Sequence, residues 1–297
     1  MARPENSNLF FKWYTVIGRV LFYYFMMGTN RRFIRLVLAA VLITACNTAR
    51  HSQQNSIVFA KNPVVAHRGA WKKNSLPENS IASLREAVRL QCTGTEFDIW
   101  MTADDSLVIH HDPEVNKMDI EKTGFEAVHL NRLSNNEPLP LLREYLQEGL
   151  RDNKTTRLVL EIKPSRISKE RGEEVAEKVV QLVQALHASK QVVYISFDAG
   201  ILQKIHALDT TAVTQYLAGD LSPAELAAAG IRGADYHYSV FKKNPGWIAA
   251  AKQLRLQLNA WTVNDAADMQ WLLENGFDFI TTNEPELLLG LLKRSGQ

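Results

Sequence analysis

Short apolar runs alternate with amphipathic segments over most of the chain. Between several runs the apolar positions recur every three or four residues, which indicates helices. One helical stripe comprises Val175, Val179, Leu182, Val183 and Leu186, and another comprises Ile81, Leu84 and Val88 after the capping pair Asn79-Ser80. The runs predicted as strands are PVVAH (63–67), TEFDIW (95–100), RLVLEIK (157–163), QVVYISF (191–197), AVTQYLA (212–218), ADYHYSV (234–240), LQLNAWTV (256–263) and FDFITT (277–282).

The number of these runs bears on the fold class. Eight predicted strands that alternate with helices favour a parallel α/β fold and predict a closed (β/α)8 barrel, the TIM barrel. An open doubly wound sheet is the alternative. Such a sheet normally carries a glycine-rich turn after its first strand, and the sequence has none there.

One connection of the predicted barrel is long. Residues 112–156 separate the region of the second strand from the strand at 157, which is too many for a single loop. The segment 141–150 has helical spacing and is predicted to be the barrel helix. The earlier part, 112–138, is then an excursion near the mouth of the barrel.

The chain opens with two apolar stretches, of which the second predicts lipid attachment. A basic segment (RRFIR) precedes the apolar run 36–45 and Cys46, which is the anatomy of a signal peptide and too short to span a bilayer comfortably. The four residues 43–46 (ITAC) resemble a lipobox, at which bacterial lipoproteins are cleaved and lipidated. We therefore predict cleavage before Cys46 and its lipidation; a plain secretory signal or an anchor helix are the alternatives.

The first apolar stretch, residues 9–27, is interrupted by Lys12 and Arg19. It is either a poor membrane helix or lies upstream of the true start of translation. Translation from Met27 would leave a signal of ordinary length, so we predict that start. The sequence leaves a start at Met1 open.

The expected organisation follows from these segments. Residues 1–46 form the apolar region and signal, residues 47–62 are mostly polar and are predicted to be a tether, and residues 63–297 form the barrel. A lipid anchor on Cys46 would hold the protein at a membrane of the bacterial cell envelope, facing the periplasm. Asn47 is not the acidic residue that commonly retains lipoproteins in the inner membrane, which favours the outer membrane.

Composition and charge exclude several classes of protein. The chain has 297 residues, of which 46% are hydrophobic and 22% charged, as in ordinary globular domains. The formal net charge is only +2, and several basic residues lie in the targeting region, so nothing favours nucleic-acid binding. Two cysteines provide neither a disulfide framework nor a thiolate zinc site. The oligomeric state is not indicated.

Acidic residues lie inside two of the predicted strands. Glu96 and Asp98 are two positions apart, so their side chains point to the same face. Glu161 ends the apolar run of the next strand, with Lys163 two positions further on. Acids that converge at the carboxyl ends of strands predict a site for one hard divalent cation, Mg²⁺ or Ca²⁺. The alternative is that they pair with Arg or Lys at exposed strand ends.

Histidines and basic residues follow strands in the same region. His67 directly follows the first predicted strand, and His110 and His111 follow another apolar run. Two such histidines beside a metal suit a phosphodiester reaction, in which one removes a proton and the other protonates the leaving oxygen. Arg68 and Lys163 offer positive charge to phosphate oxygens. Trp261 offers an apolar wall, or is simply a core aromatic residue.

These residues belong to an ordered set of motifs. The set is HRG (67–69), PENS (77–80), EFDIW (96–100), HHD (110–112), LEIK (160–163), WTVN (261–264) and GFDFITTNEP (276–285). It resembles the glycerophosphodiester phosphodiesterase family over residues 63 to 292. Each motif is weak by itself, but seven in the same order are highly specific.

The resemblance implies a TIM barrel that hydrolyses glycerophosphodiesters to glycerol 3-phosphate and an alcohol with a divalent metal. By position, it implies metal ligands at Glu96, Asp98 and Glu161, and an acid–base pair at His67 and His111. It further implies phosphate contacts from Arg68 and Lys163, a glycerol contact from Trp261 and a supporting role for Glu78. It also suggests a route through a cyclic phosphate, with the glycerol hydroxyl as the nucleophile.

Two departures from the family pattern concern the leaving group. The segment DPEVNKM (112–118) does not match the family well, and the closing motif has Asn283 where the family often has Asp. Neither removes a proposed catalytic group. A related phosphodiesterase acting on lysophospholipids, in the manner of a lysophospholipase D, is the alternative enzyme. A lipid-anchored binding module without catalysis would be expected to show a broken set of motifs, and this set is intact.

Overall fold

The apolar runs of the sequence form strands that are buried on both faces. In the strand Gly94–Met101, for example, every residue is buried, as is typical of a parallel sheet covered by helices. The structure, a computed structural model, describes residues 57–295. The parallel strands are β1 (Val64–Ala66), β2 (Gly94–Met101), β6 (Arg157–Ile162), β7 (Val192–Ser196), β8 (Val213–Tyr216), β9 (Gly233–His237), β10 (Gln257–Trp261) and β11 (Phe279–Thr282).

These eight strands close into a barrel. They pair in the order β1, β11, β10, β9, β8, β7, β6 and β2, and the pairing of β1 with β2 completes the ring. All of the pairings in the ring are parallel. The predicted (β/α)8 barrel is therefore confirmed.

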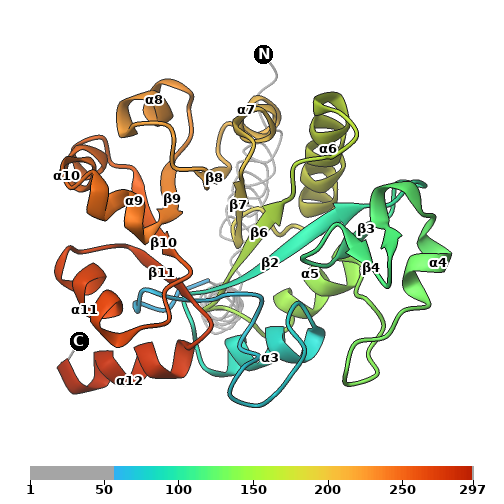
Figure 1. The fold of residues 1–297 in the computed structure, drawn as a ribbon, viewed down its shortest axis with the longest axis horizontal. Coiled ribbons are helices and arrows are strands. Elements are labelled where there is room, and N and C mark those ends of the chain that lie inside the picture. The colour runs from blue at the N-terminus through green and yellow to red at the C-terminus, as the bar shows by residue number, and fades with distance from the viewer. Residues whose placement is uncertain (1–56, 296–297) are drawn as a thin grey trace, which may run out of the picture. The chain divides into compact units, whose positions relative to one another are not determined.

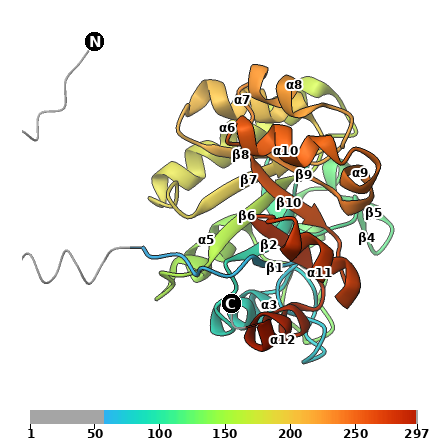
Figure 2. The same cartoon turned by 90° about the vertical axis from the view of Figure 1, so that its left-hand side faces the viewer.

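Helices surround the strands as an outer layer (Figure 1). They are α3 (Ile81–Arg89), α5 (Leu142–Leu150), α6 (Lys169–Ala185), α7 (Ala199–Leu208), α8 (Pro223–Ala228), α9 (Tyr238–Lys243), α10 (Gly246–Gln253), α11 (Ala266–Glu274) and α12 (Pro285–Ser295). Ser80 caps α3 through its side chain, as the sequence predicts. The last helix, α12, lies beside the first barrel helix, α3, in both views (Figures 1 and 2).

The alternation of side chains along each strand divides the core in two. On β2, Phe97 points outward and packs on Tyr145 of α5 with ring centroids 4.5 Å apart, while its neighbours Glu96 and Asp98 point into the barrel. Inside the barrel, apolar residues such as Val65, Val159, Val193 and Phe279 form a separate cluster. The barrel therefore carries an apolar plug below a polar mouth, where the carboxyl ends of the strands meet.

The long connection after β2 is a small substructure, as predicted. It contains β3 (Leu107–Ile109), which pairs antiparallel with β2, the hairpin of β4 (Glu114–Val115) and β5 (Met118–Asp119), a 3-10 helix (Ile120–Lys122) and α4 (Phe125–His129). Trp100, Val115, Ile120, Val128 and Leu139 give it an apolar core of its own. Buried Glu121 ties it to the loop after β6, because it accepts hydrogen bonds from Ser165 Oγ and Arg166 N at 2.6 and 2.8 Å.

The end of the predicted tether runs along the barrel. The backbone amides of Val58 and Ala60 donate to the carbonyls of Lys154 and Thr155 at 2.9 and 2.8 Å, so the compact unit begins at Ile57. Cys46, the lipobox and both candidate start residues lie outside the described residues. Among residues 57–295, no helix has the length and apolar character needed to cross a membrane.

Most predicted strands match within about two residues at each end, but one of them continues into a helix. The run 234–240 was expected to be extended throughout, but β9 ends at His237 and α9 begins at Tyr238. The His237 side chain accepts a hydrogen bond from the amide of Ser239 and so caps this helix. The hydrogen bond of this cap therefore favours a helix from Tyr238 onward, although the aromatic and β-branched residues that follow have a high β propensity.

Candidate active site

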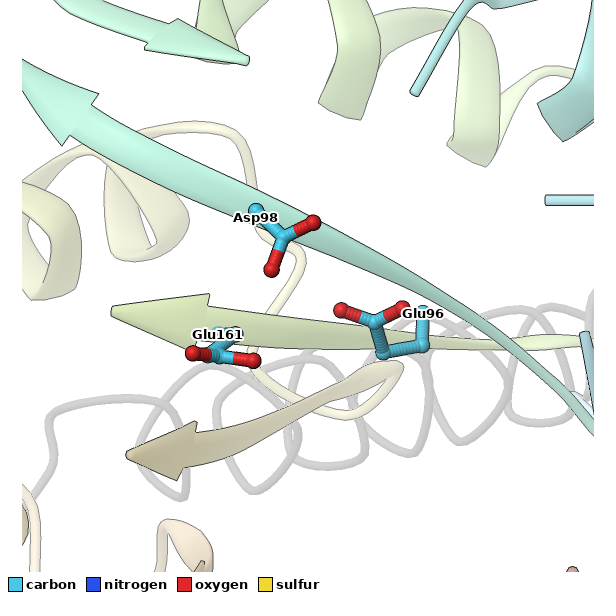
Figure 3. Close-up of side chains that lie close together, drawn as sticks. All are labelled: Glu96, Asp98 and Glu161. Atoms are coloured by element: carbon cyan, nitrogen blue, oxygen red, sulfur yellow. The ribbon is translucent and has the colours of Figure 1, made fainter. Parts of the chain in front are cut away.

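Three acids from adjacent strands meet inside the mouth of the barrel. Glu96 and Asp98 project from β2 and Glu161 from β6, where Asp98 and Glu161 are register partners. One carboxylate oxygen from each lies within 4.8 Å of the others, and the three side chains point toward one another (Figure 3). The acids are 2%, 1% and 7% exposed, so they share a space from which water is largely excluded.

This burial makes the three charges costly to maintain together. Burial and the charge of Asp98 raise the pKa of Glu161 to about 7, and burial together with both neighbouring acids raises the pKa of Glu96 well above its ordinary value. One oxygen of Glu96, Oε1, is buried without a hydrogen-bond partner among the described residues. An all-oxygen cluster with an unsatisfied carboxylate fits a hard divalent cation, which would supply the missing positive charge.

Lys163 partly neutralises the cluster. Its Nζ atom lies 2.7 Å from both Asp98 Oδ1 and Glu161 Oε1. Burial opposes its charge, but the two acids outweigh that effect and raise the pKa of Lys163. Burial likewise opposes ionisation of Asp98, yet the charge and hydrogen bond of Lys163 bring the pKa of Asp98 below its ordinary value. Lys163 is therefore a fixed cation at the centre of the site.

His67 is held at the end of β1 in a defined orientation. Its Nδ1 atom lies 2.7 Å from Asn283 Oδ1, and its Nε2 atom lies 3.9 Å from Glu96 Oε2. Burial, followed by the positive charge of Arg68, lowers the pKa of His67 to about 4. The imidazole is thus neutral at neutral pH, with Nδ1 donating to Asn283 and the lone pair of Nε2 free to accept a proton.

Arg68 follows His67 in a left-handed conformation with φ of 55°. Its backbone amide donates to Glu96 Oε2 at 2.8 Å, and its guanidinium donates to both oxygens of Glu78 at 2.9 and 3.0 Å. The turn requires Gly69, because a Cβ there would lie 2.4 Å from Ser83 Oγ and φ is 82°. The HRG motif therefore aims the Arg68 backbone at one acid while Glu78 fixes its side chain.

The two adjacent histidines of the excursion differ in their surroundings. His111 lines the same cavity as His67 and the three acids, and its Nδ1 lies 2.7 Å from Asp112 Oδ1. His110 contacts the carbonyl of Glu114 through Nε2 at 3.2 Å and is not part of the cavity wall. The structure therefore brings His67 and His111 to one cavity.

The cavity, of about 120 Å³, has two unlike halves. We call the side chains that follow β1, β2 and β6 the ionic half; they are His67, Arg68, Glu96, Asp98, His111, Glu161 and Lys163. We call the side chains from β7 to β10 the apolar half; they are Ile195, Phe197, Leu217, Asp235, Trp261 and Thr262. Trp261 packs edge-on against Phe197 at 5.5 Å, and its Nε1 donates to the carbonyl of Asp235 at 2.8 Å.

Two residues of this region were not identified from the sequence. Asn283 was noted only as a departure from the family pattern, although it orients His67. Asp235 is 1% exposed and lines the cavity from β9. Burial and the charge of Glu161 raise the pKa of Asp235 well above its ordinary value, against an opposing hydrogen bond from Asn259. A signal was present, because Asp235 is an acid inside an otherwise apolar and aromatic run.

Comparisons with known proteins identify the family of the chain. The family model described as the glycerophosphoryl diester phosphodiesterase family matches residues 67–287. A crystal structure of a glycerophosphodiester phosphodiesterase from Parabacteroides distasonis is 36% identical, with a TM-score of 0.77, and covers 81% of this chain and 100% of that one. The glycerophosphodiester phosphodiesterase of Caldanaerobacter subterraneus is 27% identical and covers 80% of this chain and 100% of its own length.

A relative from Bacillus subtilis, also a glycerophosphodiester phosphodiesterase, is 26% identical over 86% of this chain and 94% of its own length. The matched region of the family model extends from His67 to beyond Asn283 and so includes every side chain of the cavity described above. The chain belongs to the glycerophosphoryl diester phosphodiesterase family.

Proposed function

We propose that the chain hydrolyses glycerophosphodiesters to glycerol 3-phosphate and an alcohol, using one divalent cation, Mg²⁺ or Ca²⁺. The observation that carries the proposal is the buried triad of Glu96, Asp98 and Glu161, which shares one cavity with two histidines and two basic side chains. Family membership supports the reaction class.

The triad is proposed to hold the cation. When bound, such a cation would polarise the phosphoryl oxygens and offset the negative charge that develops on them. The oxygen donors and the unpartnered Glu96 Oε1 fit this role. The protein's own residues would supply the remaining functions of binding, orientation and proton transfer.

Arg68 and Lys163 are proposed to bind the phosphate. Both are anchored on acids, Arg68 by Glu78 and Lys163 by Asp98 and Glu161, so their charges are fixed before substrate arrives. A planar guanidinium can engage two phosphate oxygens at once, while the ammonium acts as a point charge. Because these charges are already held in place, the protein does not have to reorient them as charge develops on the phosphate during the reaction.

The two histidines are proposed to transfer protons. His67 is neutral at neutral pH and presents Nε2 toward the acids, which suits a general base. His111 would then protonate the leaving oxygen. By the route that the family resemblance suggests, His67 takes the proton of the substrate's own glycerol hydroxyl as that oxygen attacks phosphorus. The resulting cyclic phosphate is opened by water in a second step, with the proton roles reversed.

A substrate screen tests this function directly. Purified protein would be incubated with glycerophosphodiesters that differ in the alcohol and with lysophospholipids, each with chelator or with added Mg²⁺ or Ca²⁺. We expect metal-dependent release of glycerol 3-phosphate from the glycerophosphodiesters. Preferential cleavage of lysophospholipids would instead support the lysophospholipase D-type alternative, and absence of cleavage from every substrate would contradict the proposal.

We also propose that Cys46 is lipidated after cleavage of a signal that begins at Met27. The support is the order of basic segment, apolar run and lipobox in the sequence. The enzyme would then face the periplasm on a membrane anchor. Intact-mass measurement of the protein from the membrane fraction tests this, because an unlipidated N-terminus or a chain that still begins at Met1 would contradict it.

A further inference from the structure

Asp235 is a fully buried acid that the proposed chemistry does not use. It lies on β9 and is 1% exposed, and its Oδ1 atom has no hydrogen-bond partner among residues 57–295. The described residues provide no salt bridge to it, whereas the three acids of the ionic half, Glu96, Asp98 and Glu161, all have a basic partner or a backbone donor. A buried polar group with a free oxygen is costly, so its retention calls for a ligand.

The position of Asp235 in the ring places it across the cavity from the reacting groups. In the strand order β1, β2, β6, β7, β8, β9, β10 and β11, the strand β9 stands opposite β2, which carries Glu96 and Asp98. The strands between β6 and β9 contribute only the apolar side chains Ile195, Phe197 and Leu217 to the cavity. Asp235 is thus the single charged side chain of the apolar half in the described part of the chain.

The chemistry of its ligand follows from these surroundings. An anion such as the phosphate would be repelled by an acid that lacks a basic partner, and the phosphate already has Arg68 and Lys163 in the ionic half. A group that bonds the free oxygen must donate a hydrogen bond and must be small, because the carboxyl is 1% exposed and lines a cavity of only about 120 Å³. The nearby Trp261 Nε1 is not available as a donor, since it already donates to the backbone carbonyl of Asp235. A hydroxyl meets both requirements, and a carboxyl group retains an acceptor oxygen whether or not it carries a proton.

One neighbour of Asp235, Asn259, donates a hydrogen bond to its carboxyl but leaves the Oδ1 atom without a partner. Thr281 Oγ1 donates to Asn259 Oδ1 at 3.2 Å, and Asn259 is the register partner of Asp235 on β10. Thr281 also lines the cavity, but its hydroxyl already donates to Asn259. The free Oδ1 therefore has the cavity as its remaining source of a donor.

We propose that Asp235 determines specificity for the glycerol moiety by accepting a hydrogen bond from its terminal hydroxyl. This inference rests on the proposed function. The glycerol moiety of the substrate has two free hydroxyls. If the one next to the phosphate ester acts as the nucleophile at the ionic half, the terminal hydroxyl is the one that can reach Asp235 across the cavity. Trp261 and Phe197 then flank the carbon skeleton, and Asp235 recognises its far end.

The test compares glycerophosphocholine with the phosphocholine diester of propane-1,2-diol, which lacks only the terminal hydroxyl and keeps the nucleophilic one. Wild-type protein with Mg²⁺ or Ca²⁺ should favour the glycerol substrate by roughly 10- to 100-fold in kcat/KM, as expected when loss of the hydroxyl leaves a buried carboxyl oxygen without a hydrogen bond. Asp235→Leu should remove most of this preference by slowing the glycerol substrate alone, and Asp235→Asn should remove part of it.

Gln215→Leu is the matched control, because it removes a buried polar side chain from the neighbouring strand β8 that bonds Gln257 and does not line the cavity. It should slow both substrates by the same factor. If the wild-type protein cleaves both diesters equally, the inference is overturned and the proposed function is left intact. This comparison uses the wild-type protein alone, so it does not depend on whether any variant folds. Equal losses on both substrates in Asp235→Asn would also overturn it. A wild-type protein that cleaves neither substrate would contradict the proposed function itself.

A head-group comparison separates this inference from recognition of a cationic alcohol. Glycerophosphoethanol carries the same glycerol but a neutral leaving group. Asp235→Asn should affect glycerophosphocholine and glycerophosphoethanol by the same factor. A loss confined to the choline substrate would place Asp235 at the leaving group and overturn its assignment to glycerol.

Discussion

The two halves of the cavity are built from equivalent parts of one barrel, yet their side chains have opposite character. In the ionic half, acids and bases are held within hydrogen-bonding distance of one another, as where Lys163 Nζ lies 2.7 Å from both Asp98 and Glu161. In the apolar half, the rings of Phe197 and Trp261 pack edge-on. Among the described residues that form this half, Asp235 is the only acid. The repeating strand geometry fixes where side chains point, and the residue types then give one side ionisable groups and the other mainly apolar surface.

Because the two halves differ in chemistry, we expect mutations in them to have different effects. Changes in the ionic half should lower turnover on every substrate, because they affect the groups that we propose to contact the reacting phosphate. Changes in the apolar half should alter KM or substrate preference and spare metal binding. The following predictions test this difference, beginning with the largest expected effect.

The metal ligands should be the most sensitive positions. Glu161→Gln removes one charge from a small all-oxygen site, so metal affinity should fall strongly and activity should approach background at ordinary metal concentrations. Metal binding can be measured by calorimetry, alongside turnover of glycerophosphocholine. Glu177→Gln, an acid on the surface of α6, is the control and should change neither. Full activity with unchanged metal affinity in Glu161→Gln would show that the ligand assignment is wrong.

The cavity histidines should come next. His67→Ala and His111→Ala should each lower kcat by roughly 10²- to 10⁴-fold, the usual contribution of general acid or base catalysis. His110→Ala is a natural control, because its side chain contacts a carbonyl of the excursion and lies outside the cavity wall. Steady-state kinetics at saturating metal would measure the three losses. Equal and small losses at all three positions would refute the pairing of His67 with His111.

Arg68→Lys should be damaging although the charge is kept. The guanidinium uses only its Nη1 atom to bind Glu78, which leaves its other nitrogens for the phosphate. An ammonium has a single nitrogen and cannot replace this planar, two-sided arrangement. We expect kcat/KM to fall by about 10- to 100-fold, the value of a charged hydrogen bond. Lys122→Arg, a conservative change on the surface of the excursion, should have no effect. Wild-type kcat/KM in Arg68→Lys would mean that the side chain has no role in phosphate binding.

Trp261→Ala should have the smallest effect and a different signature. Loss of the aromatic wall should raise KM up to about tenfold or change substrate preference, because aromatic packing contributes about 0.5–1.5 kcal/mol beyond its area. Metal affinity should remain that of the wild type. A loss of metal binding would instead show that Trp261 is a core residue whose removal disorders the barrel.

The barrel could be predicted from the sequence because the patterns that indicate it are local and recur along the chain. The strand and helix periods appear in each βα unit, and helix α5 and the excursion lie where the spacing of residues 112–150 indicated. Glu96 and Asp98 could be placed on one face because the side chains of a strand alternate, whatever surrounds it. The same rule could not say which strands stand opposite one another.

The residues that were missed depend on long-range proximity. Asn283 orients His67 across 216 positions of sequence, and only the pairing of β1 with β11 brings the two together. The position of Asp235 depends on closure of the ring, because closure buries the residue and places its strand opposite the strand of Glu96. The early end of β9 was missed because the cap at His237 is a side-chain contact that propensity does not report.

We propose that the ionic half is a metal-dependent centre for cleaving glycerophosphodiesters. Phosphorus NMR of glycerophosphocholine with metal-free protein, followed by addition of Mg²⁺ or Ca²⁺, tests it most directly. The account predicts no cleavage before the addition and glycerol 3-phosphate as the phosphorus-containing end product after it, with any cyclic phosphate appearing earlier. Cleavage that continues undiminished in chelator, or release of phosphocholine in place of glycerol 3-phosphate, would contradict it.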